Sequence, residues 1–185
     1  MPTSVLDDLQ QSLGEAGRLV EALQDDQWDA PTPCSGWNVR DVVRHLTAGN
    51  ALFAQAIAGQ DGPADGLGPV ADDAAAYARS VELLVAASAA PEALDQLVSV
   101  PFGVVPGPVA VQMRVVEALV HGWDLARATG QTTTFADDLV DRTDGFTRQL
   151  LERVPSDRSP FRPPVPAADD APPLDRLAAL LGRPA

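Results

Sequence analysis

The sequence contains no lysine and only one cysteine. All 13 basic side chains are arginines, and they face 26 acidic residues, so the formal net charge is −13. Such a charge repels nucleic acids and anionic membrane surfaces, and we expect neither as a partner. A single cysteine, Cys34, cannot form an internal disulfide, which is typical of a reducing compartment.

Long apolar runs are also missing from the chain. Apolar residues make up 45% of the 185 residues, but no run is long enough to cross a membrane. The N-terminus, MPTSVLDDLQQSLGEAGRLV, has early acids and lacks the apolar centre of a signal peptide. The composition therefore predicts a cytoplasmic protein with one domain, residues 1–185, that is large enough to bury a core.

Apolar residues recur at helical spacing over most of the chain, which predicts an all-α fold. Asn38 is a favourable N-cap, and Gly130 suits the end of a helix. Residues 97–108 are β-branched but interrupted by prolines and glycines, so an extended connection or a short hairpin is expected there. Residues 155–173, rich in proline and acid, should form an extended tail. Helices are expected over residues 4–24, 39–58, 71–89, 109–130, 134 or 136 to 154, and 174–183.

The only two histidines, His45 and His121, both lie in apolar helical segments. Glu117 precedes His121 by four residues, so the two side chains share a helix face, with Asp124 one turn further along. Ionisable groups on a mostly buried helix cost free energy unless they are paired or bind a metal. Because packed helices lie ~8–10 Å apart, His45 can complete a set of two imidazoles and one carboxylate. We therefore expect a divalent metal site at His45, Glu117 and His121.

The same spacing also fits a plain hydrogen bond between Glu117 and His121, with His45 as a core histidine. Placement of both histidines on apolar faces favours the metal site. Asp41 and Asp124 are candidate acceptors that would orient the imidazole rings. Cys34 is expected to be a small buried residue near the bundle end, since His45 lies a rise of about 10 Å into its helix.

Two segments resemble motifs of the DinB-like metal-binding superfamily: TPCSGWNVRDVVRHL at residues 32–46 and VVEALVHGWDLARATGQ at residues 115–131. The closer likeness is to the mycothiol-dependent maleylpyruvate isomerase N-terminal-domain group. PFG at residues 101–103 and the closing FRPPVP…LDRLAALLGR are similar to its small single-domain actinobacterial members. The resemblance implies a DinB-like four-helix bundle with a long crossover, short extra helices and a proline-rich C-terminal tail. It also implies that His45, Glu117 and His121 are the metal ligands, each matching a family ligand position.

The resemblance further implies a thiol-dependent transferase or isomerase that acts on a small electrophile. Mycothiol would be the cosubstrate, with its sulfur bound as thiolate at an open metal position. Zinc is the expected metal, and nickel, iron and manganese suit the same ligands. Arg44 and Arg114 are candidates for binding a carboxylate of the thiol or substrate, with a solvated surface charge as the alternative. Trp37 and Trp123 are candidates for the pocket mouth, with a core position as the alternative.

An interpretation from a different class is a non-catalytic bundle that binds or senses a metal or thiol, or that binds a protein partner.

The isomerase has a further C-terminal domain, and the residues after Pro155 are too few to form one. An open metal position beside solvent would favour an enzyme, and a closed four-ligand site would favour a structural role. The chain is expected to be a monomer or a homodimer.

Overall fold

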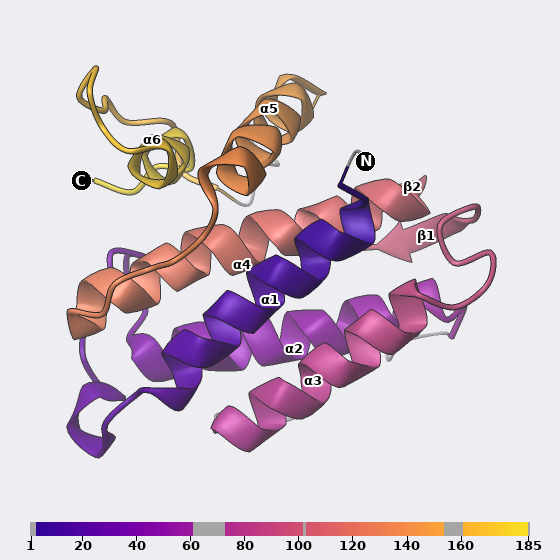
Figure 1. Cartoon of the computed structure of the whole chain (residues 1–185), viewed down its shortest axis with the longest axis horizontal. Helices are drawn as coiled ribbons and strands as arrows, with labels where there is room; N and C mark the ends of the chain where they lie inside the picture. Colours follow the sequence, from indigo (N-terminus) through magenta and orange to yellow (C-terminus); the bar gives the residue numbers. More distant parts are fainter. Residues whose placement is uncertain (1–2, 61–72, 102, 154–160, 185) are drawn as a thin grey trace.

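The first four helices of the computed structural model lie side by side, and the last two lie against the fourth (Figure 1). The structure describes residues 3–60, 73–101, 103–153 and 161–184. Its elements are α1 (Val5–Glu21), a 3-10 turn (Asp25–Gln27), α2 (Val39–Ile57), α3 (Ala74–Ser88), β1 (Leu97–Val100), β2 (Gly103–Pro106), α4 (Gly107–Thr129), α5 (Asp137–Arg153) and α6 (Pro173–Leu180). The predicted all-α four-helix bundle with short extra helices is confirmed.

The two helices that carry the candidate ligands begin and end where local signals indicate. Asn38 caps α2: its side chain accepts from the backbone N–H of Asp41, and the Asp41 carboxylate accepts from the Asn38 N–H. α4 ends at Thr129, because Gly130 adopts a left-handed φ of 73° that glycine tolerates without steric cost. Both ligand-bearing helices are therefore fixed by residues that the sequence already indicates.

A short antiparallel hairpin leads into α4, one of the two arrangements predicted for residues 97–108. β1 pairs with β2 so that Val98 lies opposite Val105. Val98 is buried, whereas Leu97 and Val104 are exposed, in keeping with the alternation of a strand with one covered face. The hairpin thus anchors the beginning of α4 to the bundle.

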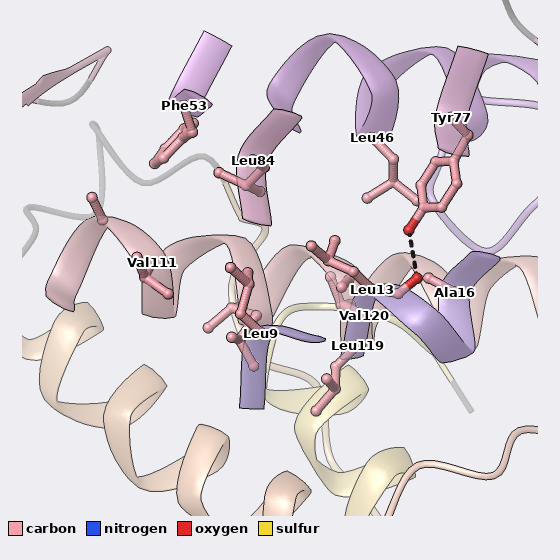
Figure 2. Close-up of a cluster of buried hydrophobic side chains, with 14 of the residues drawn as sticks. Leu9, Leu13, Ala16, Leu46, Phe53, Tyr77, Leu84, Val111, Leu119 and Val120 are labelled. Carbon is pink, nitrogen blue, oxygen red and sulfur yellow. Dashed lines mark hydrogen bonds between the residues drawn. The ribbon is translucent and has the colours of Figure 1, made fainter. Parts of the chain in front are cut away.

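Helices α1, α2, α3 and α4 all contribute side chains to the core of the bundle (Figure 2). The hydroxyl of Tyr77 on α3 donates to the carbonyl of Leu13 on α1 at 3.1 Å, so this buried polar group is satisfied. Buried side chains labelled in the view are Leu9, Leu13, Ala16, Leu46, Phe53, Tyr77, Leu84, Val111, Leu119 and Val120. Within the described helices, none is both long and apolar enough to span a bilayer.

The helix ends differ from the expected ones mainly at the chain's periphery. α1 ends at Glu21, three residues early, and α6 ends at Leu180 because Gly182 takes a left-handed φ of 79°. α3 begins at Ala74, capped by Asp73; residues 71 and 72 lie outside the described part. Residues 161–172 contain no helix or strand, as expected of the tail, and residues 154–160 also lie outside the described part.

Candidate metal centre

Three side chains from two helices converge between α2 and α4: His45, Glu117 and His121, called the triad below. Nε2 of His45 lies 2.7 Å from Oε2 of Glu117, and Nε2 of His121 lies 3.3 Å from the same oxygen. One possible ligand atom from each residue lies within 4.8 Å of the other two. The structure thus brings together the three residues that the sequence singled out.

The two helices supply the triad differently. Glu117 and His121 lie one turn apart on α4, and their side chains are 17% and 4% exposed. His45 was expected among core residues of α2, and this expectation is wrong, because its side chain is 38% exposed. The buried stripe of α2 runs through Val42 and Leu46, and His45 lies at the edge of that stripe. Its ring is therefore reachable from outside the bundle core.

The electrostatics of the triad keep the carboxylate charged. Burial alone would raise the pKa of Glu117, but hydrogen bonds from His121 and His45 outweigh it and hold the pKa well below the usual value. Burial would lower the pKa of His121, but the bonds to Asp124 and Glu117 raise it instead. The ionised Glu117 carboxylate is the form that binds a divalent cation, whereas His121 binds one as the neutral imidazole and releases any proton on Nε2 when it does so.

Asp124 orients the ring of His121. Its Oδ2 lies 3.0 Å from Nδ1 of His121, so the ring donates there and directs Nε2 toward Glu117. Arg183 compensates the charge of the fully buried Asp124 across 3.1 Å. A carboxylate behind a histidine is a common support for a metal ligand, and together with the triad it fits a divalent cation. Asp41, the other candidate acceptor, instead caps α2 and pairs with Arg44.

The loop before α2 brings Cys34 to the same place. The backbone of Pro31 bridges to Asn38, and the Thr32 N–H donates to the Trp37 carbonyl at 3.0 Å, so the loop folds back on itself. The sulfur of Cys34 lies within 4.8 Å of ligand atoms of His121 and Asp124. Burial raises the pKa of the Cys34 thiol, and Arg183 opposes that shift. Cys34 was expected to be a small buried residue near the bundle end; it is half-buried, and the folded-back loop brings it beside His121.

Two cavities of about 240 Å³ each reach His45 and Glu117. The first, called the apolar cavity, is lined by His45, Gly49, Leu52, Phe53, Pro101, Val105, Met113, Arg114, Val116, Glu117, Leu150, Leu151 and Phe161. The second, called the polar cavity, is lined by Pro33, Cys34, Ser35, Trp37, His45, Glu117, His121, Phe161, Arg162, Gly182 and Arg183. The lining residues contributed by the C-terminal segment were not among the predicted site residues, because no spacing rule relates them to α4.

The predicted aromatic residues at the mouth separate into one that lines the site and one that does not. The Trp37 ring stacks on His121 with centroids 5.7 Å apart and an interplanar angle of 14°. Trp123 is buried instead, and its Nε1 donates to Asp175 of α6 at 2.6 Å, with Arg127 over the ring. Trp123 is absent from the described lining of both cavities, so the geometry gives it a structural position.

The two predicted arginines also differ. Arg114 is 2% exposed, lies one turn before Glu117 and lines the apolar cavity. Burial lowers the pKa of Arg114, and the negative charge of Glu117 opposes that shift. Arg44 is exposed, pairs with Asp41, and is not among the described lining residues of either cavity. Of the two, only Arg114 is placed to meet a bound molecule.

Comparison with known families identifies the fold that carries this site. Residues 9–126 match the sequence model of the family described as mycothiol maleylpyruvate isomerase N-terminal domain. The chain belongs to this family. The matched residues include the whole triad and Arg114, whereas the C-terminal segment that closes the polar cavity lies beyond them.

Relatives of this member of the mycothiol maleylpyruvate isomerase N-terminal domain family include two uncharacterized proteins of Mycobacterium tuberculosis, MT0763 and Rv0738. Each is 36% identical over 167 residues, which is 89% of this chain and 90% of the relative. The fold resembles crystal structures of the mycothiol-dependent maleylpyruvate isomerase and a mutant of it, with TM-scores of 0.58 and 0.59 at 20% and 21% identity. These matches cover 76% of this chain, which spans 66% of the isomerase's length.

Proposed function

We propose that this protein binds one divalent metal ion through His45, Glu117 and His121 and uses mycothiol to transform a small electrophile by thiol transfer or isomerisation. Zinc is the first candidate, and nickel, iron and manganese share the ligand chemistry. When bound, the ion would act as a Lewis acid that lowers the pKa of a coordinated thiol, so that the thiolate exists at neutral pH. The observation that carries the proposal is the convergence of three ligand atoms within 4.8 Å, with cavities beside them.

The residues around the triad have distinct tasks in this proposal. Asp124 fixes the ring of His121 so that Nε2 faces the ligand point. Glu117 stays ionised between the two imidazoles and supplies the negative charge. The Trp37 ring covers one face of His121 and excludes water from it. The chain thus offers an oriented and charged donor set before any ion arrives.

The two cavities support a catalytic role over a purely structural one. A structural site would be closed by four protein ligands, whereas His45 and Glu117 line both cavities here. We assign the polar cavity, with Cys34, Arg162 and Arg183, to the polar thiol cosubstrate. We assign the apolar cavity to the electrophile. A cytoplasmic location belongs to the same proposal, because a thiol cosubstrate has to be kept reduced.

The test is a thiol-transfer assay on protein purified without a histidine tag and loaded with zinc. A panel of maleylpyruvate, α,β-unsaturated carbonyl compounds and alkyl halides is incubated with and without mycothiol, and the loss of electrophile is followed. We expect mycothiol-dependent turnover in the wild type and its loss in Glu117→Gln. The matched control is Glu152→Gln, an exposed glutamate on α5, which should retain turnover. A zinc-loaded wild type that stays inactive over the whole panel would contradict catalysis and leave a binding function.

A further inference from the structure

Arg114 is a buried cation that forms no ion pair within the described part of the chain. It is 2% exposed, its Nε and one terminal nitrogen donate to Oδ1 of Asn50 at 3.3 and 3.0 Å, and the same nitrogen lies 3.4 Å from the Leu46 carbonyl. These partners are neutral. In the part of the chain that the structure describes, no carboxylate forms an ion pair with Arg114, and its Nη1 has no hydrogen-bond partner. Nη1 is not among the buried side-chain atoms that lack a partner, so it retains accessible surface and is open to a ligand.

The surroundings of Arg114 are arranged to admit its guanidinium. A Cβ at Gly49 would lie 2.5 Å from Nη1, so only glycine leaves room for this side chain between α2 and α4. The Phe53 ring lies 5.3 Å from the guanidinium carbon and covers one side of it. Nη1, which lacks a partner, is thus held in place on the wall of a cavity.

The remaining walls of that cavity are almost entirely apolar. Besides Arg114, its only ionisable lining residues in the described part are His45 and Glu117 of the triad. Oε2 of Glu117 lies 2.7 Å from Nε2 of His45 and 3.3 Å from Nε2 of His121, so this oxygen faces the two histidines. One free cationic donor on an apolar wall, next to the triad, matches a ligand with one anionic group and an apolar body.

We infer that Arg114 binds the anionic group of the substrate, and that the apolar cavity selects aliphatic or aromatic monocarboxylates. This inference rests on the proposed function, because it gives the electrophile of that reaction its class. A guanidinium binds a carboxylate through charge-assisted hydrogen bonds. A second carboxylate on the same molecule would have to lie against Leu, Val, Met or Phe side chains, so compact dicarboxylates should bind more weakly.

Isothermal titration calorimetry with three probes tests the inference: hexanoate, its uncharged analogue hexanamide, and the dicarboxylate succinate. We expect zinc-loaded wild type to bind hexanoate about tenfold or more tightly than hexanamide, and more tightly than succinate. Arg114→Met should abolish the preference for hexanoate over hexanamide. Arg148→Met, which removes an exposed arginine of α5, should keep the preference.

Gly49→Ala provides a second way to remove the guanidinium from its position, since the new Cβ overlaps Nη1. If Arg114→Met does not fold, Gly49→Ala still tests the inference. Circular dichroism checks the fold of both variants. Zinc content is measured on the same samples, so loss of the metal site is distinguished from loss of anion binding. Equal affinity of wild type for hexanoate and hexanamide would overturn the inference with the zinc site intact. A full preference for hexanoate in both folded variants would overturn it as well.

Discussion

The imidazole of His121 donates to the carboxylate of Asp124 one turn further along α4, with Nδ1 and Oδ2 3.0 Å apart. Asp124 is completely buried, so bulk solvent does not compete for this hydrogen bond. The pair sets the tautomer of His121 and leaves Nε2 to face Glu117. Asp124 therefore holds the His121 ring of the proposed ligand set in its orientation.

Asp124→Asn should weaken zinc binding by about 10–100-fold while leaving all three ligands present. The amide is neutral, so it supports the donated hydrogen bond less well and makes the imidazole a poorer ligand. Competition with a chromogenic chelator measures the affinity. Asp138→Asn, an exposed change on α5, is the control. Equal zinc affinity in wild type and Asp124→Asn would contradict the supporting role of this carboxylate.

Arg183→Met should lower the free energy of unfolding by about 3 kcal/mol. The substitution leaves the buried Asp124 carboxylate without the guanidinium that lies 3.1 Å from it. Urea denaturation followed by circular dichroism gives the value. Arg148→Met removes a half-exposed arginine and should change the free energy by less than about 0.5 kcal/mol. If both variants lose a similarly small amount of unfolding free energy, the ion pair between Arg183 and Asp124 does not stabilise the fold.

Two glycine-to-alanine changes should move stability in opposite directions. A Cβ at Gly122 on α4 would lie 2.7 Å from the Phe135 ring, so Gly122→Ala should cost about 1–2 kcal/mol through overpacking. Gly145 on α5 has no atom within 4 Å of its Cβ position, so Gly145→Ala should gain about 0.5–1 kcal/mol from helix propensity. Thermal unfolding of both variants checks the signs. Stabilisation by Gly122→Ala would disprove the tight contact with Phe135.

Glu15 should make stability depend on pH in the acidic range. Burial would raise its pKa, but hydrogen bonds from Arg18 and the Thr134 N–H outweigh this and lower it. A lowered folded-state pKa adds stability above the unfolded value of about 4.3, which is lost as pH falls through the folded pKa. Glu15→Gln should thus cost about 1–2 kcal/mol at pH 7 and less below about pH 4. A cost that stays constant from pH 7 to pH 3 would rule out the charge as its cause.

The parts of the fold and site that follow from local spacing were predictable from the sequence. Glu117 and His121 share a face because they are four residues apart in a helix, and the cap at Asn38 fixes where α2 begins. His45 was predicted to meet these two residues, and it lies beside Glu117; its partial exposure was not predicted. Periodicity marks the apolar stripe of a helix well but leaves the residues at the edge of that stripe undecided.

The parts that depend on contacts distant in sequence were not predictable in this way. Arg183 meets Asp124 across 59 residues, and Cys34 reaches the site only because its loop folds back. Trp123 donates a hydrogen bond to Asp175 of α6, a contact that is also distant in sequence. Nothing in the local pattern around these residues specifies which distant segment covers them.

The most direct test of the central claim is the zinc content of untagged protein, measured by inductively coupled plasma mass spectrometry after reconstitution and dialysis. Wild type should retain one zinc ion per chain, and His45→Ala, Glu117→Gln and His121→Ala should each retain far less while remaining folded. Glu152→Gln should match the wild type. A wild type without bound zinc, nickel, iron or manganese after reconstitution, or variants that hold zinc as well as the wild type does, would contradict the claim that the triad binds a metal.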